Sequence, residues 1–364
     1  MDNETMLRDK ATILHISEQI KQRITAPCVV MEVCGTHTMS ISRWGIKDFL
    51  PPHMKLISGP GCPVCVTDSS TMSKAIQLAL TPDVIFTCFG DMMRVPAGDT
   101  SLRESAGNGA DIRVVLSPLE ALGLAINNPD RKVVFFAIGF ETTAPLTAAT
   151  LIKAREMDLR NFYVLCAHKT MPSAISALLS NGGVDALLCP GHVAAITGAK
   201  VFSFIPDTLG KPAAISGFEP VDIMLALGYI AKDISCGKPR LTNCYPRTVK
   251  DTGNQTAKEM MEQVFCAEDA VWRGLGNIPA SGLALRPEYK RFDALTNFTL
   301  DKDILHDNPN CCCGDILRGK MTPLECPLFG VECTPESPCG ACMVSSEGAC
   351  SAAFRYERKN RNEI

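Results

Sequence analysis

The stretch VVFFAIGFETT at residues 133–143 has a counterpart in VVMEVCGTHT at residues 29–38. Each is an apolar run that ends in a glycine followed by polar residues and threonines, which is typical of a buried strand that leads into a loop. Segments of helical periodicity alternate with further apolar runs at residues 84–89, 114–116, 162–166 and 185–190. This alternation predicts parallel sheets covered by helices.

The chain has 364 residues, more than one core of typical size, since domains usually have roughly 100–150 residues. We therefore predict two similar parallel-sheet α/β domains facing a cleft, and a smaller cysteine-rich domain. Residues 1–125 would form an N-terminal helix and the first α/β domain, which carries the loops CGTHT and GPGCPVC. Residues 126–234 would form the second, which carries GFETTAP and PGHV, and residues 235–364 the third. Ligands gather at the carboxyl ends of parallel strands, where these loops lie.

Composition excludes several classes of protein. With 36 Lys and Arg against 39 Asp and Glu, the net charge is −3, which does not favour binding to nucleic acid or to an acidic membrane. No apolar run approaches the ~20 residues that span a bilayer, and the first ten residues lack the apolar core of a signal peptide. We expect a cytoplasmic protein with no membrane or nucleic-acid partner.

Cysteine is over-represented, with 18 residues in the chain and eight of them in the last 54. Because the chain shows no sign of secretion, clustered thiolates favour zinc or an iron–sulfur cluster over disulfides. Four cysteines can be chosen at a wide spacing, which favours the iron–sulfur cluster without excluding zinc: Cys311, Cys326, Cys333 and Cys350. Cys313 and Cys342 would then lie beside the metal as a thiol pair, and Cys312 and Cys339 would be spare thiols.

The segment SGPGCPVCVT at residues 58–67 places Cys62 and Cys65 in a CxxC motif framed by glycine and proline. Two sulfurs at this spacing form a small disulfide ring or bind one metal, and half of a structural zinc site is the alternative. We expect a rigid loop that exposes both sulfurs. A helix beginning near residues 70–72 would lower the pKa of a thiol.

Other polar residues follow apolar strands. Cys34 ends one strand, and a tight turn would bring the imidazole of His37 near its sulfur and favour the thiolate, although inert packing is the alternative. Glu141 is either a site residue or part of a helix cap. His168 and His192 lie in loops just past strands, where they contribute either to chemistry or only to loop hydrogen bonds.

The motifs CGTHT, GPGCPVC, GFETTAP, PGHVAAITG and CPLFGVECTPESPCGACMVSSEGAC occur in this order. Together they resemble the HypD family of hydrogenase maturation factors, over about residues 8–358. The resemblance implies two α/β domains and a cluster-bearing third domain. It also implies assembly of the Fe(CN)2CO unit of [NiFe] hydrogenases together with a HypC-type chaperone and a HypE-type cyanide donor.

The same resemblance implies roles for individual residues. Cys34 would hold the iron being assembled, and Cys62 with Cys65 would form a redox-active pair. Cys313 with Cys342 would form a second thiol pair, and a [4Fe–4S] cluster would be bound by Cys311, Cys326, Cys333 and Cys350. His37, Glu141 and His192 match motif positions of the family and are included in the predicted site.

Two features depart from the family pattern. Cys312 makes a triplet with its neighbours where the family has CxC, and Cys339 lies outside the pattern. A different hypothesis is an iron–sulfur disulfide reductase acting on a protein thiol partner, and a zinc-stapled binding module is a third. Redox activity in cofactor assembly is expected under the first hypothesis, but the residues alone leave open whether the protein is an enzyme.

Overall fold

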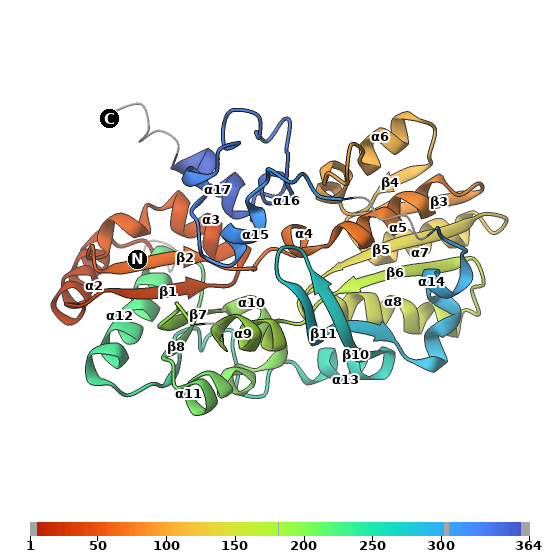
Figure 1. Ribbon diagram of the computed structural model, residues 1–364. Helices are drawn as coiled ribbons and strands as arrows, with labels where there is room; N and C mark the ends of the chain where they lie inside the picture. The colour runs from red at the N-terminus through yellow and green to blue at the C-terminus, as the bar shows by residue number, and fades with distance from the viewer. Residues whose placement is uncertain (1–5, 181, 302–305, 358–364) are drawn as a thin grey trace.

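The computed structural model describes residues 6–180, 182–301 and 306–357. The ends of the predicted ranges 1–125 and 235–364 therefore lie partly outside the described residues. Two parallel sheets form the body of the protein, and the cysteine-rich segment lies over the end of the first sheet and the junction between the two (Figure 1). The prediction of an α/β fold with parallel sheets and a cysteine-rich region near the C-terminus is confirmed.

The first sheet has five strands, and all neighbouring pairs are parallel. Their spatial order is β2 (Met54–Ser58), β1 (Cys28–Glu32), β7 (Ala186–Pro190), β8 (Ala213–Ser216) and β9 (Leu241–Asn243). Helices α2 (Lys10–Arg23) and α12 (Pro220–Cys236) cover one face. Ile13, Ile16 and Ile20 form the buried stripe of α2, whereas the neighbouring Leu14 is exposed.

The second sheet has four strands, again parallel throughout. Their spatial order is β4 (Ile112–Val114), β3 (Val84–Cys88), β5 (Lys132–Gly139) and β6 (Phe162–His168). Helices α7 (Pro118–Asn127) and α8 (Ala144–Glu156) pack on one face, and α5 (Ser69–Leu80) contributes to the core on the other.

The two sheets do not correspond to consecutive stretches of chain. Strands β1 and β2 pair with β7 to β9, whereas β3 and β4 pair with β5 and β6. The chain therefore enters the first sheet, crosses to the second and returns. The predicted ranges 1–125 and 126–234 each contribute strands to both sheets.

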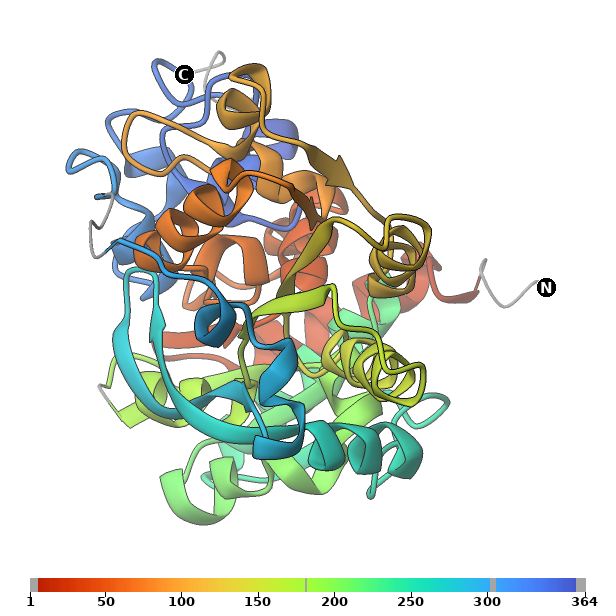
Figure 2. The same ribbon diagram turned by 90° about the vertical axis from the view of Figure 1, so that its right-hand side faces the viewer.

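An antiparallel hairpin, β10 (Phe265–Trp272) and β11 (Gly276–Leu285), follows α13 (Gln255–Val264). It lies against β6 and α9 (Met171–Ser180), as the two views in Figures 1 and 2 agree. Its tip reaches the CxxC loop through a bridge between Thr67 and Trp272. The sequence did not predict this hairpin.

The cysteine-rich segment contains short helices joined by loops: α15 (Cys313–Leu317), α16 (Ala341–Val344) and α17 (Ala349–Tyr356). Helix α17 packs on α3 (Gly35–Arg43), and α16 packs on α4 (Pro63–Val66). The largest core cluster contains residues of both sheets and of this segment. The segment therefore shares its core with the α/β body.

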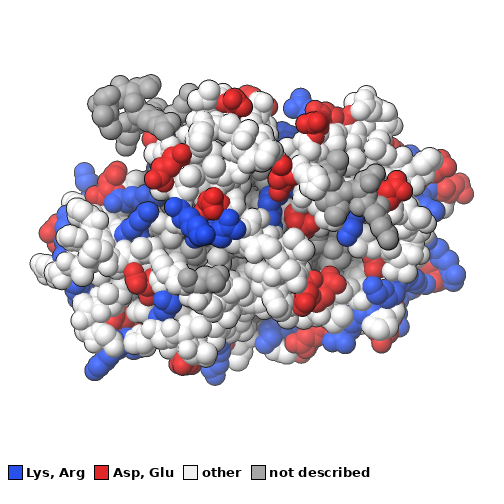
Figure 3. Space-filling model, in the orientation of Figure 1, with Lys and Arg blue, Asp and Glu red and all other residues white. Residues whose placement is uncertain are grey.

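Acidic and basic side chains are mixed over the face of the molecule seen in Figure 3. Within the described ranges, no helix combines the length and the apolarity that crossing a membrane requires.

Candidate functional site

Cys34 lies directly after β1 and caps the N-terminus of α3. Its side chain is only 8% exposed, and its backbone N–H donates to Glu32 Oε2 at 3.0 Å. Burial raises the pKa of Cys34 to about 12, and the nearby carboxylates of Glu347 and Glu32 act in the same direction. The thiol is therefore protonated at neutral pH, and a bound cation would be needed to stabilise its thiolate.

The imidazole of His37 does not serve Cys34 in the way that the sequence suggested. Its Nε2 lies 2.9 Å from the carbonyl oxygen of Gly217, and its ring packs on Phe218 with centroids 4.7 Å apart. Burial lowers the pKa of His37 to about 4, so the ring is neutral. His37 supports the Cys34 sulfur through its backbone hydrogen bond instead.

The CxxC loop packs backbone to backbone against Cys34. The N–H of Gly35 donates to the carbonyl oxygen of Gly61 at 2.8 Å. A Cβ on Gly61 would lie 2.2 Å from the nitrogen of Cys34, so only glycine permits this approach. The two loops that the sequence singled out separately are thus one structural unit.

Both sulfurs of this motif are buried, which corrects the expectation of an exposed pair. Cys62 is 3% exposed and Cys65 is fully buried, because α16 covers them and the Cys65 sulfur lies 3.8 Å from the carbonyl oxygen of Ala341. The expected lowering of the thiol pKa is also wrong for Cys65. Burial and the neighbouring thiols of Cys342 and Cys62 raise the pKa of Cys65.

The sulfurs continue from this motif into the cysteine-rich segment. Cys342 lies within hydrogen-bonding reach of Cys313, Cys350 and Cys65, and these contacts lower the pKa of Cys342. The contacts with Cys313 and Cys342, together with burial, raise the pKa of Cys350. Cys342 therefore lies in the middle of a group of buried thiols that are close enough for thiol–disulfide exchange.

The four predicted cluster ligands belong to the same group of sulfurs. Cys311 Sγ lies 3.2 Å from Cys313 Sγ, and burial and its neighbours raise the pKa of Cys333 to about 12. Burial and the contact with Cys326 raise the pKa of Cys312, so this spare thiol lies beside a predicted ligand.

The segment offers a sulfur-rich donor set, which fits an iron–sulfur cluster. Gly340 leaves room for two of these sulfurs, because a Cβ at this position would lie 2.4 Å from Cys311 Sγ and 2.7 Å from Cys313 Sγ. Among the described residues, no three His, Cys, Asp or Glu side chains are arranged to hold a single metal ion.

A cavity of about 400 Å³ opens beside Cys34. Residues that follow strands of both sheets line it: Gly61 after β2, Thr142 after β5, and His192, which lies in the first turn of α10 (Gly191–Thr197) and not in the predicted loop. His192 is exposed and stacks on Phe218 with ring centroids 4.0 Å apart. Partial burial lowers the pKa of His192.

Glu347 also lines this cavity, and the sequence analysis missed it. Its Oε1 accepts a hydrogen bond from Thr36 Oγ1 at 2.7 Å, and a Cβ on Gly35 would lie 2.4 Å from its own Cβ. Its position between Cys342 and Cys350 is the only signal in the sequence, and that signal does not distinguish it from a surface glutamate. The fold brings it to a loop more than three hundred residues away.

Two predicted polar residues lie apart from the lining of this cavity. Glu141 Oε1 accepts the N–H of Met171 at 3.0 Å at the start of α9, and its Oε2 is buried without a partner in the described part of the chain. Burial raises the pKa of Glu141 to about 7. His168 is the last residue of β6 and not part of a loop as predicted. It is buried, and its Nε2 lies 2.9 Å from Thr147 Oγ1, so it has the hydrogen-bonding role that was considered as its alternative.

Comparison with known proteins agrees with this arrangement of motifs. The sequence model of the family described as "HypD: Hydrogenase formation hypA family" matches residues 10–357. Hydrogenase maturation factor HypD of Escherichia coli (strain K12) is 42% identical over 356 residues, which cover 97% of this chain and 94% of that protein.

Two further relatives show the same extent of similarity. Hydrogenase maturation factor HypD2 of Bradyrhizobium diazoefficiens is 43% identical, covering 96% of each chain. HypD of Cupriavidus necator is 44% identical over 90% of this chain and 89% of that protein. The chain belongs to the HypD family of hydrogenase maturation factors.

Proposed function

We propose that this protein is a scaffold and redox factor that assembles the Fe(CN)2CO unit of [NiFe] hydrogenases with a HypC-type chaperone and a HypE-type cyanide donor. Iron is the cargo, and the Cys34 thiolate is its anchor. A soft thiolate suits low-spin iron that carries strong-field ligands. The cavity of about 400 Å³ beside Cys34 gives the incoming ligands and a partner's residues access to this sulfur.

One observation supports this proposal most strongly: the anchor and the buried sulfurs are adjacent. The loop that carries Cys34 is bonded to the CxxC loop through Gly35 and Gly61, and Cys65 in turn lies beside Cys342. Iron bound at Cys34 would therefore be one loop away from a source of electrons.

The two thiol pairs can together transfer two electrons by thiol–disulfide exchange. When Cys62 and Cys65 close a disulfide, the two electrons and two protons that they lose pass to the iron-bound reactants held at Cys34, which are the oxidant of this step. The Cys342 thiolate then attacks Cys65 Sγ, which forms a mixed disulfide and frees Cys62. Attack by Cys313 on Cys342 frees Cys65 and leaves a Cys313–Cys342 disulfide.

A [4Fe–4S] cluster held by Cys311, Cys326, Cys333 and Cys350 would pass on two electrons from an external donor, one at a time, which together with two protons return the Cys313–Cys342 disulfide to thiols. Two polar residues of the predicted site, His37 and His192, shape the surroundings of Cys34 without taking part in electron transfer. His37 fixes the loop around Cys34 through Gly217, and His192 presents a neutral ring at the mouth of the cavity.

A disulfide reductase acting on an external protein thiol would use the same sulfurs. It would, however, need a CxxC motif that the partner can reach. With Cys62 only 3% exposed and Cys65 fully buried, an internal relay is the better supported role.

Infrared spectroscopy of the complex with the HypC-type chaperone, purified without oxygen, tests the proposal. We expect cyanide and carbonyl stretching bands in the wild-type complex and their loss in Cys34→Ala. Cys88→Ala is the matched control, because Cys88 is another buried cysteine at the end of a strand, with its pKa raised to about 12 by burial. Intact bands on a stable Cys34→Ala complex would contradict the anchor role.

A further inference from the structure

Arg273 occupies an unusual position at the tip of the β10–β11 hairpin. It is 6% exposed, although arginine is rarely buried unless its charge is compensated. The sequence analysis gave it no role, and the proposed mechanism does not use it. Figure 1 shows the hairpin tip close to α4, which carries Cys65.

Three contacts hold Arg273 between the CxxC loop and the cysteine-rich segment. Its backbone N–H donates to the carbonyl oxygen of Val66 at 2.9 Å, and its Nε donates to that of Thr67 at 2.7 Å. Its Nη1 lies 2.9 Å from Asp307 Oδ1, just before the cysteine triplet. The adjacent Gly274 packs directly on Gly314, the residue after that triplet.

The remaining nitrogen of the guanidinium, Nη2, is buried and has no hydrogen-bond partner among the described residues. A buried charged donor without an acceptor is unfavourable, and native proteins keep few of them. The hairpin turn that carries Arg273 packs on the residue that follows the cysteine triplet, since a Cβ on Gly274 would lie 2.4 Å from the Cα of Gly314. The unused donor therefore lies in the buried layer next to the chain that carries Cys311 and Cys313, and it lacks an acceptor among the described residues.

Asp307 compensates this charge only in part. The side chain of Asp307 is 42% exposed, whereas that of Arg273 is 5% exposed. Solvent screens the exposed carboxylate more strongly than it screens the buried guanidinium. The interior around the C-terminal sulfurs therefore experiences net positive charge from this pair.

We propose that Arg273 is a positioning residue that stabilises negative charge on the C-terminal sulfurs and so raises the reduction potential of the cluster that they hold. Reduction of the cluster takes one electron from an external donor and adds one negative charge, which a fixed positive charge favours. Charges and hydrogen bonds near the sulfurs are established determinants of cluster potential. The inference rests on the proposed function, because it requires the cluster.

A redox titration of the anaerobically prepared holoprotein, followed by electron paramagnetic resonance, tests this role. We expect the midpoint potential to fall in Arg273→Gln, where the charge is lost, and to stay near the wild-type value in Arg273→Lys, where it is kept. A tenfold change in this one-electron equilibrium corresponds to about 59 mV. In Asp307→Asn, removal of the opposing carboxylate should raise the potential.

Arg318→Gln is the matched control. Arg318 contacts the carbonyl oxygen of Gly274 and pairs with Asp315 at 2.9 Å, but its side chain is 39% exposed. It lies close to the same hairpin turn and should not change the potential. A shift in Arg318→Gln as large as in Arg273→Gln would contradict a specific role for the buried charge.

The remaining outcomes are also decisive. An unchanged potential in Arg273→Gln at full iron and sulfide content would overturn the inference alone. An equal fall in Arg273→Lys would assign the effect to geometry and also overturn it. If Arg273→Gln does not retain iron, the direction of the shift in Asp307→Asn decides. Wild-type protein without iron or sulfide would overturn the cluster part of the proposed function and this inference with it.

Discussion

Burial keeps Cys34 and His37 neutral at neutral pH. The pKa of Cys34 is raised to about 12, and that of His37 is lowered to about 4. The free protein therefore presents a thiol and a neutral imidazole. Under the proposed function, iron bound at Cys34 would replace the thiol proton, so that capture of the cargo would be coupled to release of a proton.

Glu141 gives a prediction on the dependence of stability on pH. Its pKa in the folded protein is raised by burial to about 7, above the ordinary value of 4.5, so the folded state holds this proton more tightly than the unfolded chain. Its contribution to stability is complete below about pH 4.5 and is lost as the pH rises through about 7. We expect Glu141→Gln to match the wild type at low pH and to be more stable above pH 7, by up to about 3 kcal/mol.

Urea unfolding of both proteins between pH 4.5 and 8 measures this difference. Glu32, His37 and His168 also have shifted pKa values, but they are common to both proteins and cancel in the comparison. Glu156→Gln, at an exposed carboxylate near the end of α8, is the control and should show no such trend. A constant difference at every pH would show that the carboxylate is not buried as described.

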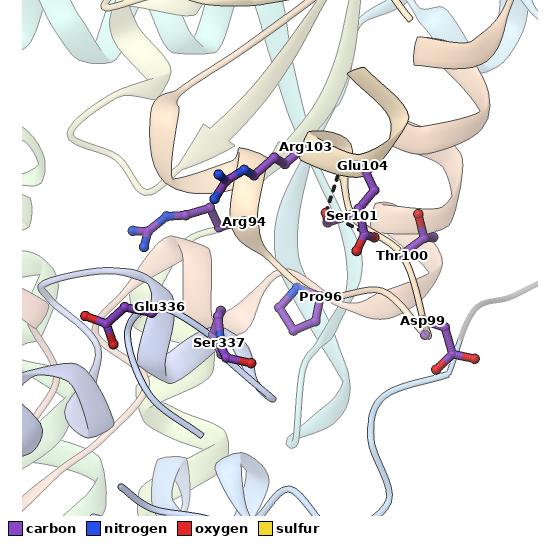
Figure 4. A pocket seen from close by; sticks show the side chains of 11 residues that line it. Arg94, Pro96, Asp99, Thr100, Ser101, Arg103, Glu104, Glu336 and Ser337 are labelled. Atoms are coloured by element: carbon purple, nitrogen blue, oxygen red, sulfur yellow. Dashed lines mark hydrogen bonds between the residues drawn. The ribbon is translucent and has the colours of Figure 1, made fainter. Parts of the chain in front are cut away.

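At the scale of elements, one arginine ties α16 to the α/β body. Arg94 donates to the carbonyl oxygens of Pro335 and Val344, both at 3.0 Å, and Val344 ends the short helix that carries Cys342. Figure 4 shows Arg94 and Arg103 side by side in a cavity of about 540 Å³, with Glu336 and Ser337 across from them. A helix of four residues has little stability of its own, so these bonds hold it in place.

We expect Arg94→Met to loosen α16 by about 1–3 kcal/mol, the range for losing a charged hydrogen-bond donor. The measurable consequence is faster alkylation of Cys342, followed by mass spectrometry of the protein prepared with reduced thiols. Arg103→Met removes the neighbouring, exposed guanidinium and should leave the rate at the wild-type value. Equal rates in wild type and Arg94→Met would show that packing alone holds α16.

Most strands with both faces buried were predictable from the sequence, but β8 (Ala213–Ser216), which is fully buried and contains two alanines, was missed. The apolar run at residues 133–138 lies within β5 (Lys132–Gly139), whose residues after Lys132 are all buried. Strand β4 (Ile112–Val114) was predicted two residues too late, because Leu116 is apolar but 86% exposed. The β10–β11 hairpin lacks such a run, since β10 carries exposed acidic residues, and its pairing depends on distant partners.

For the whole molecule, the sequence indicated which cysteines to consider as site residues, but it did not indicate what surrounds them in the fold. Motif spacing drew attention to Cys34, the CxxC motif and the terminal cysteines. The burial of Cys65, the entry of Glu347 into the cavity and the position of Arg273 all depend on contacts between segments far apart in the chain. No local pattern encodes such contacts.

The crossing of the chain between the sheets gives the last prediction. A fragment of residues 126–234 contains β5 and β6 without β3, and β7 and β8 without β1. Each pair would expose a strand edge and an apolar surface that its sheet normally covers. We therefore expect this fragment to show no cooperative thermal transition by circular dichroism and little dispersion in its amide spectrum.

A fragment of residues 82–170 is the control, because it keeps all four strands of the second sheet in one stretch, and it should be the more ordered of the two. A cooperative transition in the 126–234 fragment would instead support an independent domain over that range.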